Sequence, residues 1–218
     1  MSIEKTSNVF TCKIKHIPLK RLFDILFSCF VIFLFFPVML LIALLIKISS
    51  PGKIFFSHER IGRGGRKFLC YKFRTMYPDA EKRLREILKE NPEKLLEWSQ
   101  TQKLKDDPRV TPIGEILRKT SLDEFPQFWN VLKGDLSVVG PRPVVESEII
   151  NHFGPKAEKI LSIRPGITGA WQVSGRSDIS YQTRVLLDEK YVDQRSMLLD
   201  LILIIKTIPS VMLFKGAY

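Results

Sequence analysis

Residues 25–46, ILFSCFVIFLFFPVMLLIALLI, determine how the rest of the chain must fold, because they contain no charged side chain. As a helix, this stretch would be about 33 Å long, which is enough to cross a bilayer. It is too long for a cleaved signal peptide, and no small-residue cleavage site follows it. The stretch therefore predicts a helix embedded in a membrane.

Two arrangements of this helix are open: a single span, or a re-entrant hairpin that enters and leaves by the same face. Pro37 lies near the middle, where it removes a helical hydrogen bond and clashes with the preceding turn. Both flanks are basic, with Lys20 and Arg21 before the segment and Lys47 and Lys53 after it. The positive-inside tendency favours both ends in the cytoplasm. Simple spans also carry proline and flanking charge, so the residues alone leave the two arrangements equally open.

The charge balance indicates an anionic partner. The chain has 34 Lys and Arg against 23 Asp and Glu, a formal net charge of +11. Nucleic acid, acidic lipid and a phosphorylated substrate all fit this excess. Its three cysteines and three histidines are widely spaced, which argues against a disulfide framework, a zinc site or a histidine metal site. With 45% apolar residues, the chain is long enough for one domain with a real core.

The remaining patterns predict an α+β, mostly helical fold. Residues 54–76 look strand-like in places, and residues 171–176 predict a strand leading into a turn. Helices are expected at 79–105, interrupted at Asn91-Pro92, and at 113–119, 146–153 and 180–195. Residues 197–214 predict an amphipathic helix that lies in the membrane interface or packs on the domain. We expect one compact cytosolic domain tied to the membrane segment.

An acidic pair lies in the aromatic stretch T-S-L-D-E-F-P-Q-F-W-N at 120–130. Ser121 and Glu124 have the spacing of a capping box, which predicts a helix N-terminus at about 121–124. Capping alone would explain both carboxylates. The alternative is catalytic: Asp123 attacks a phosphoryl group while Glu124 binds a divalent metal such as Mg²⁺.

Three basic elements are candidates for a phosphate site. Lys72 and Arg74 fall on one face of the same predicted strand. Arg118 lies about one helical turn before the acidic pair, and Arg142 stands between two prolines that restrict its backbone. A rigidly placed guanidinium suits bidentate phosphate binding, although any one of these cations alone would more simply form a surface ion pair. Asp106-Asp107 imitates a glycosyltransferase metal motif, but the following proline favours a turn.

Several motifs occur in a fixed order along the chain. They are K-F-R-T-M at 72–76, D-P-R-V-T-P-I-G at 107–114, L-R-K-T-S-L-D-E-F-P-Q-F-W-N-V-L-K-G-D at 117–135, V-G-P-R-P at 139–143, R-P-G-I-T-G at 164–169 and W-Q-V-S-G-R at 171–176. Together they make the sequence resemble the bacterial monotopic phosphoglycosyl transferases, also called bacterial sugar transferases. The resemblance extends from about residue 19 to residue 214.

The resemblance implies transfer of a sugar 1-phosphate from a UDP-sugar to a polyprenol phosphate, usually undecaprenyl phosphate, with release of UMP. It makes Asp123 the nucleophile that forms a covalent phosphosugar intermediate, and Glu124 the ligand of Mg²⁺. Phosphate- or nucleotide-binding roles would fall on Lys72, Arg74, Arg118, Arg142, Gln172 and Arg176.

The resemblance also implies a place in the cell and a division of the chain. Residues 19–50 would form a re-entrant helix broken at Pro37, which turns the open choice toward the hairpin. An N-terminal tail (1–18) would precede it, and a membrane-associated catalytic domain (51–218) would follow it. We therefore expect a monotopic protein of the bacterial inner membrane, on its cytoplasmic face.

The helical insert at 79–105 and the motif W-Q-V-S-G-R at 171–176 resemble members that handle galactose or glucose in capsule, exopolysaccharide or O-antigen assembly. Members that use N-acetylated amino sugars are the alternative. A function of another class, a membrane-anchored basic binding protein, is suggested by the R-G-G-R stretch at 63–66. No helix-turn-helix or aromatic RNA-binding signature accompanies that stretch, so we expect no nucleic-acid partner. The sequence does not decide whether the protein forms a homo-oligomer.

Overall fold

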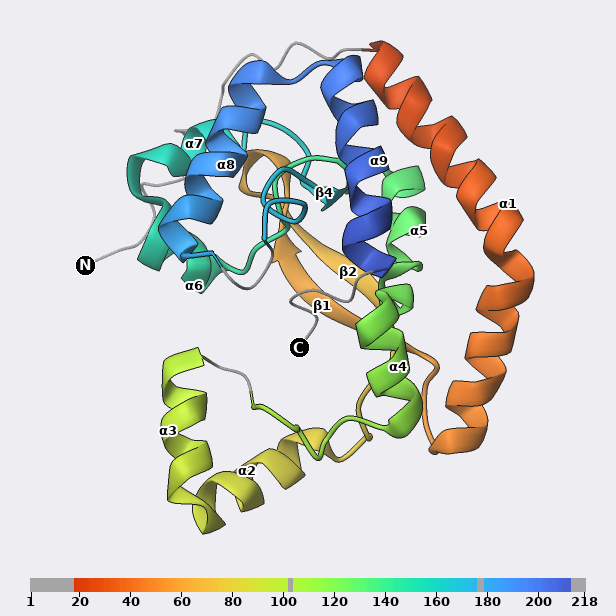
Figure 1. Cartoon of the computed structure of the whole chain (residues 1–218), viewed down its shortest axis with the longest axis vertical. Helices are drawn as coiled ribbons and strands as arrows, with labels where there is room; N and C mark the ends of the chain where they lie inside the picture. The colour runs from red at the N-terminus through yellow and green to blue at the C-terminus, as the bar shows by residue number, and fades with distance from the viewer. Residues whose placement is uncertain (1–17, 102–103, 176–178, 213–218) are drawn as a thin grey trace.

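Helix α1 (Pro18–Ser49) holds the apolar stretch and curves along one side of the molecule (Figure 1). A computed structural model describes residues 18–101, 104–175 and 179–212. Within these residues, α1 is the one helix that is long and apolar enough to cross a membrane. The helix continues through Pro37 as one curved helix (Figure 1). The structure therefore does not show the predicted hairpin of two helices.

Two small sheets form the β part of the fold. Strands β1 (Phe55–Ile61) and β2 (Lys67–Phe73) pair antiparallel, with Phe55 opposite Phe73 and Ile61 opposite Lys67. Gly64 and Gly65 have positive φ angles in the connecting turn, a conformation that glycine adopts without steric cost. Strands β3 (Ser137–Val139) and β4 (Gly166–Thr168) pair in parallel. The predicted strands within 54–76 are confirmed.

Helices make up most of the described chain, and the predicted α+β, mostly helical class is confirmed. Besides α1 they are α2 (Ala80–Glu90), α3 (Pro92–Thr101), α4 (Pro112–Thr120), α5 (Gln127–Lys133), α6 (Glu146–Glu148), α7 (Ala157–Ile160), α8 (Tyr181–Gln194) and α9 (Met197–Met212). The expected break at Asn91-Pro92 separates α2 from α3, and these two helices extend away from the rest of the protein (Figure 1).

Residues 171–175 form turns, so the strand predicted at 171–176 is wrong in the described part of that segment. The backbone hydrogen bonds explain why. The Gln172 amide donates to the Gly169 carbonyl, and the Ser174 amide donates to the Trp171 carbonyl. These short-range bonds use the groups that a strand would offer to a neighbour.

The main hydrophobic core lies where α5, β3, α8 and α9 meet. Its buried members are Val131, Leu136, Val138, Val139, Tyr191 and Leu203. A second cluster joins the C-terminal half of α1 to β2 and α4 through Ile42, Ile46, Phe73 and Leu117. Part of the membrane-type helix is therefore integrated into the core of the domain.

Asp24 attaches the N-terminal half of α1 to the domain. Its side chain is buried and accepts hydrogen bonds from the Ser137 hydroxyl at 2.9 Å and the Val138 amide at 3.1 Å. The Lys20 ammonium lies 2.9 Å from Asp24 and 2.9 Å from Asp200 of α9. This buried carboxylate, directly before the apolar stretch, is thus satisfied by β3 and by the charge of Lys20, which also pairs with α9.

The C-terminal end of α1 is held by Arg74. Its guanidinium donates to the Ser50 carbonyl at 2.8 Å and to the Pro51 carbonyl at 2.5 Å. Arginine near a helix C-terminus pairs with carbonyls that have no partner inside the helix. Both ends of α1 are therefore hydrogen-bonded to one and the same domain.

Helix α9 is amphipathic and packs on the domain, as one of the two alternatives for 197–214 predicted. Asp200 and Leu203 are buried, whereas Leu198, Ile205 and Ile208 are all more than half exposed. In Figure 1, α9 lies close to α5 and to the N-terminal half of α1. The exposed faces of α1 and α9 carry large apolar side chains, which is typical of a membrane-binding surface.

Replacing Asp24 by alanine should weaken the attachment of α1. The change leaves the buried Val138 amide without its acceptor and Lys20 without one of its two carboxylates, so we expect a loss of about 3 kcal/mol in the free energy of unfolding. Denaturant unfolding in detergent micelles measures it. The control is Glu115→Ala, which breaks an exposed pair with Lys119 and should cost less than about 0.5 kcal/mol. Equal losses in both variants would contradict the anchoring role.

Candidate active site

The acidic pair lies on a tight turn between two helices. Asp123 and Glu124 belong to a 3₁₀ turn, η2 (Leu122–Glu124), that follows α4 and precedes α5. Ser121 adopts a left-handed conformation with φ 57° and ends α4. Its side chain makes no capping hydrogen bond, and the Glu124 amide donates to the Ser121 carbonyl instead. The predicted capping box is therefore wrong, because the backbone takes the bond that the hydroxyl would have made.

Lys72 of β2 links the two carboxylates. Its ammonium lies 2.5 Å from the Glu124 Oε1 and 3.5 Å from the Asp123 Oδ2. Burial on its own would lower the pKa of Lys72, but the two carboxylates outweigh it and raise that pKa. The ammonium is thus held in its charged form between the acids.

Asp123 is the more deeply placed acid, with 7% of its surface exposed, whereas Glu124 is about one third exposed. Burial raises the pKa of the Asp123 carboxyl to about 6, against the opposing charges of Lys72 and Arg118. The carboxylate is therefore mostly ionised at neutral pH and more basic than an ordinary aspartate. A more basic carboxylate is a better nucleophile.

Arg118 approaches the pair from α4, as its spacing suggested. Its Nε donates to the Thr75 hydroxyl at 2.9 Å. Burial lowers the pKa of Arg118, and the nearby Asp123 charge opposes that effect. A fixed guanidinium next to Asp123 stabilises negative charge that develops there.

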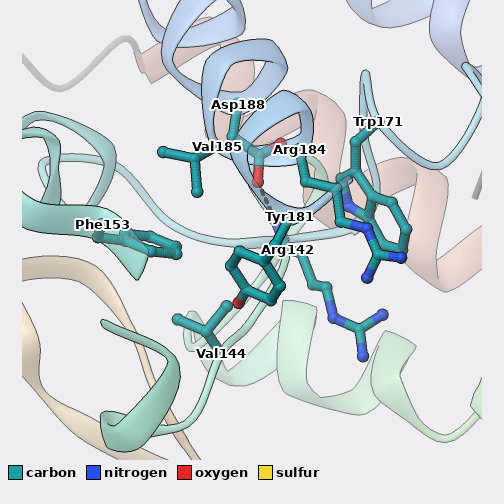
Figure 2. A pocket seen from close by; sticks show the side chains of 8 residues that line it. All are labelled: Arg142, Val144, Phe153, Trp171, Tyr181, Arg184, Val185 and Asp188. Carbon is teal, nitrogen blue, oxygen red and sulfur yellow. Dashed lines mark hydrogen bonds between the residues drawn. The ribbon is translucent and has the colours of Figure 1, made fainter. Parts of the chain in front are cut away.

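Arg142 belongs to a second group of side chains, which includes Trp171, Arg184 and Asp188 and lines a small pocket (Figure 2). Its guanidinium carbon is 5.1 Å from the centre of the Trp171 ring, and its backbone amide donates to the Asp188 Oδ2 at 3.2 Å. The charge of Arg142 acts on Lys72 and disfavours the protonated ammonium. The structure therefore brings Arg142 into the same electrostatic environment as the Asp123–Glu124 turn.

Two further arginines join this group and were not singled out in the sequence. Arg60 of β1 pairs with Glu148 at 3.5 Å, and burial together with Arg142 lowers its pKa. Arg184 of α8 lies over Trp171, 5.0 Å from the ring centre. The available signals were the acid-free run that begins at Arg60 and the position of Arg184 in the first turn of a helix. Neither signal indicates which surface the side chain faces.

Three other predicted site residues have different outcomes. Arg74 is not brought to the pair, because it binds the carbonyls at the end of α1. The side-chain amide of Gln172 donates to the Ile167 carbonyl of the neighbouring strand β4 at 2.8 Å. Arg176 falls outside the described residues. Asp106-Asp107 forms the expected turn, in which Asp107 pairs with Arg109 at 2.6 Å and not with a second acid.

Two carboxylates bridged by a lysine, with arginines nearby and a long apolar helix in the same molecule, define a class: a protein that handles anionic groups at a membrane surface. The chain belongs to the bacterial sugar transferase family, whose model matches residues 15–214. The prediction of a transferase enzyme of this family is confirmed.

Three relatives illustrate the similarity. The exopolysaccharide production protein ExoY of Sinorhizobium fredii is 49% identical over 199 residues, 91% of this chain and 88% of that protein. The undecaprenyl-phosphate galactose phosphotransferase of Salmonella typhimurium is 44% identical over 92% of this chain and 42% of that protein. A UDP-N-acetylgalactosamine-undecaprenyl-phosphate N-acetylgalactosaminephosphotransferase of Aeromonas hydrophila is 36% identical over 91% of this chain and 45% of that protein.

Replacing Asp188 by asparagine should change how stability depends on pH. Burial raises the pKa of Asp188 to about 7 from its usual 3.8, so the folded protein holds this proton more tightly than the unfolded chain. Wild-type stability should therefore fall as the pH rises from 4 to 7. The variant has no carboxyl group at this position, so its free energy of unfolding does not fall in this way. Between pH 5 and 7, its free energy of unfolding should rise relative to that of the wild type by about 1 kcal/mol per pH unit.

Unfolding midpoints at pH 5, 6 and 7 test this prediction. Asp193→Asn is the matched control on the same helix, since Asp193 is more than half exposed in its pair with Lys159. Its difference from the wild type should stay constant with pH. A constant difference for Asp188→Asn as well would contradict the raised pKa.

Proposed function

We propose that the protein transfers a hexose 1-phosphate from a UDP-sugar to undecaprenyl phosphate and releases UMP. The observation that carries this proposal is the buried Asp123 held beside Glu124 by Lys72. This is the first membrane step of capsule, exopolysaccharide or O-antigen assembly. Galactose is the first choice of sugar, with glucose next, because of the similarity to the Salmonella galactose phosphotransferase. An N-acetylated amino sugar is the alternative, given the more distant Aeromonas relative.

In the first step, an Asp123 oxygen attacks the phosphorus that bears the sugar. A new bond forms between that oxygen and the phosphorus, and the bond to the bridging oxygen of the diphosphate breaks. UMP leaves with the electron pair, and the sugar phosphate stays on Asp123 as an acyl phosphate. Lys72 and Arg118 offset the negative charge that gathers around this phosphorus.

In the second step, a phosphate oxygen of undecaprenyl phosphate attacks the same phosphorus. The bond to Asp123 breaks, and the carboxylate is restored with its electron pair. The product is undecaprenyl diphosphate carrying the sugar. Each step exchanges one P–O bond for another, so no oxidant or further reactant is needed.

The donor atoms fit a Mg²⁺ ion that is held mostly by substrate. Within the described residues, no three His, Cys, Asp or Glu side chains form a metal cage. Mg²⁺ usually takes one or two carboxylates together with substrate phosphates and water. Glu124 is the more exposed of the two carboxylates and would supply the protein ligand. The ion would neutralise charge on the diphosphate.

The attachment of α1 supports a monotopic arrangement. Asp24 near one end and Ser50 beyond the other both bond to the same domain, which carries most of the charged residues. A helix fixed in this way has both ends on one side of a bilayer. We propose that residues 19–50 enter and leave the inner membrane by its cytoplasmic face, with the bend at Pro37. Residues 51–218 then form the membrane-associated catalytic domain, after the tail at 1–18.

Replacing Asp123 by asparagine should abolish the reaction. The amide cannot form the acyl phosphate, so UMP release should fall at least about 1,000-fold. The assay uses protein in nanodiscs with a panel of UDP-sugars, Mg²⁺ and undecaprenyl phosphate. Denaturant unfolding checks that the variant is folded, and Glu115→Gln on the exposed face of α4 is the matched control.

Release of UDP in place of UMP would contradict the phosphosugar transfer. If Asp123→Asn still released UMP, the nucleophile would have to be a residue other than Asp123. The panel also identifies the sugar, since the fastest UDP-sugar distinguishes galactose or glucose from an N-acetylated amino sugar.

A further inference from the structure

Phe56 of β1 is an exposed aromatic side chain on the same sheet face as Lys72. Strands β1 and β2 lie side by side (Figure 1), and their register places Phe56 directly opposite Lys72. Opposite residues of an antiparallel pair point to the same face of the sheet. The Phe56 side chain is 52% exposed. A flat apolar ring is therefore open to solvent next to the lysine that holds the acidic pair.

His58 continues this face and stacks on Phe56. The centres of the two rings are 6.4 Å apart, and their planes differ by 27°. His58 lies opposite Cys70, two residues from Lys72, which places it on the same face. Burial and the nearby charge of Arg60 lower the pKa of His58, so its ring is mostly neutral at pH 7. We call this uncharged pair, Phe56 and His58, the aromatic platform.

Lys72 connects the aromatic platform to the acidic turn by direct contact. Its ammonium lies 2.5 Å from the Glu124 Oε1 and 3.5 Å from the Asp123 Oδ2. At its other end, the Cβ atoms of Lys72 and Phe56 are about 5 Å apart, as in other opposite pairs. The Phe56 ring therefore lies about one lysine side chain away from the two carboxylates, on the face that Lys72 shares with them.

The neighbours of the aromatic platform argue against a lipid-facing role. On its own face, Phe56 is next to charged side chains, with Lys72 opposite and Arg60 further along β1. The exposed apolar surface that suits a bilayer is instead on α1 and α9. Phe55 points to the opposite face of the sheet, where it stacks on Phe73. Rings placed among cations are typical of nucleotide sites, in which the ring stacks on the base and the cations bind phosphate.

The donor of the proposed reaction carries a base at one end and the reacting phosphorus near the other. When that phosphorus lies at Asp123, the second phosphate and the ribose separate it from the uracil. The side chain of Lys72 separates the acids from the aromatic platform in the same way. Uracil needs only a flat ring to stack on, because every base has a π-face. Undecaprenyl phosphate has no ring, so the platform suits the donor and not the acceptor.

We propose that Phe56, supported by His58, is the surface on which the uracil base of the donor stacks. The inference rests on the proposed function and names the part of the site that recognises the nucleotide. It requires Phe56 to contribute to the binding of UDP-sugar and of UMP through the base. It also requires the binding of undecaprenyl phosphate to be independent of Phe56.

UMP and ribose 5-phosphate, which lacks the base, test the proposal as competitors of the first step. The assay follows capture of labelled sugar phosphate from the UDP-sugar on protein in nanodiscs. Phe56→Ala should weaken competition by UMP roughly 5- to 100-fold, the range expected for loss of one base–aromatic stack. Competition by ribose 5-phosphate should not change. In the complete reaction, the apparent affinity for UDP-sugar should fall by the same factor as that for UMP, and the apparent affinity for undecaprenyl phosphate should stay the same.

Three further variants separate stacking from other roles of the ring. Phe56→Tyr keeps the ring and should keep most of the affinity for UMP. Phe56→Leu keeps an apolar side chain without a ring and should lose most of that affinity. Leu69→Ala is the matched control, because Leu69 is also about half exposed but lies on the opposite face of the same hairpin. It should leave both competitors unchanged.

Equal weakening of UMP and ribose 5-phosphate by Phe56→Ala, or full affinity in Phe56→Leu, would overturn the stacking role. A loss of affinity for undecaprenyl phosphate in Phe56→Ala would indicate a lipid contact and would overturn it as well. If the wild type released UMP and Phe56→Ala bound UMP as tightly as the wild type, the base site alone would be overturned. If the wild type released no UMP, the proposed function itself would be refuted.

Discussion

The structure depends on the way a long apolar helix is tied to a charged domain. Asp24 would be costly in the middle of apolar surface, and it is tolerated because β3 offers it a hydroxyl and an amide while Lys20 neutralises it. The same lysine reaches Asp200, so α1, β3 and α9 are fixed by one polar cluster. Strand β3 and helix α5 pack against α1, and the acidic turn lies beside β2.

The site combines rigidity with charge of both signs. Ser121 holds a left-handed conformation that serine adopts at a cost of about 1 kcal/mol, and the turn places two carboxylates within reach of one lysine. A net charge of +11 and an acidic pair therefore do not conflict. In the proposed reaction the cations bind phosphate groups, and the buried Asp123, whose pKa is raised by burial, is the nucleophile. The aromatic neighbours mainly pack: Phe128 is buried against Phe27 of α1, although Trp129 is exposed.

Local patterns predicted most of the elements, and long-range contacts account for most of the errors. Proline, glycine and apolar spacing located α1, the β1–β2 pair, α2, α3, α8 and α9. The capping box failed because residue spacing does not show that a backbone carbonyl will take the bond. Arg74 lies on the same strand face as Lys72, yet its guanidinium binds the Ser50 carbonyl just beyond the end of α1. Local sequence patterns do not predict such a contact between residues 24 positions apart. Arg184 was missed for the same reason, since it lies on helix α8 whereas the ring it covers, Trp171, belongs to the turns before that helix.

The double attachment of α1 also bears on how such a protein is made and how it can change. A membrane segment that serves only as a tether can be exchanged for another of equal hydrophobicity. Helix α1 cannot, because Asp24 satisfies β3 and the carbonyls that follow its last turn hold Arg74. Placement of α1 and folding of the domain must therefore be completed together. Substitutions on the inner face of α1 are constrained by its contacts with the domain. On the exposed face of α1, one apolar residue can replace another.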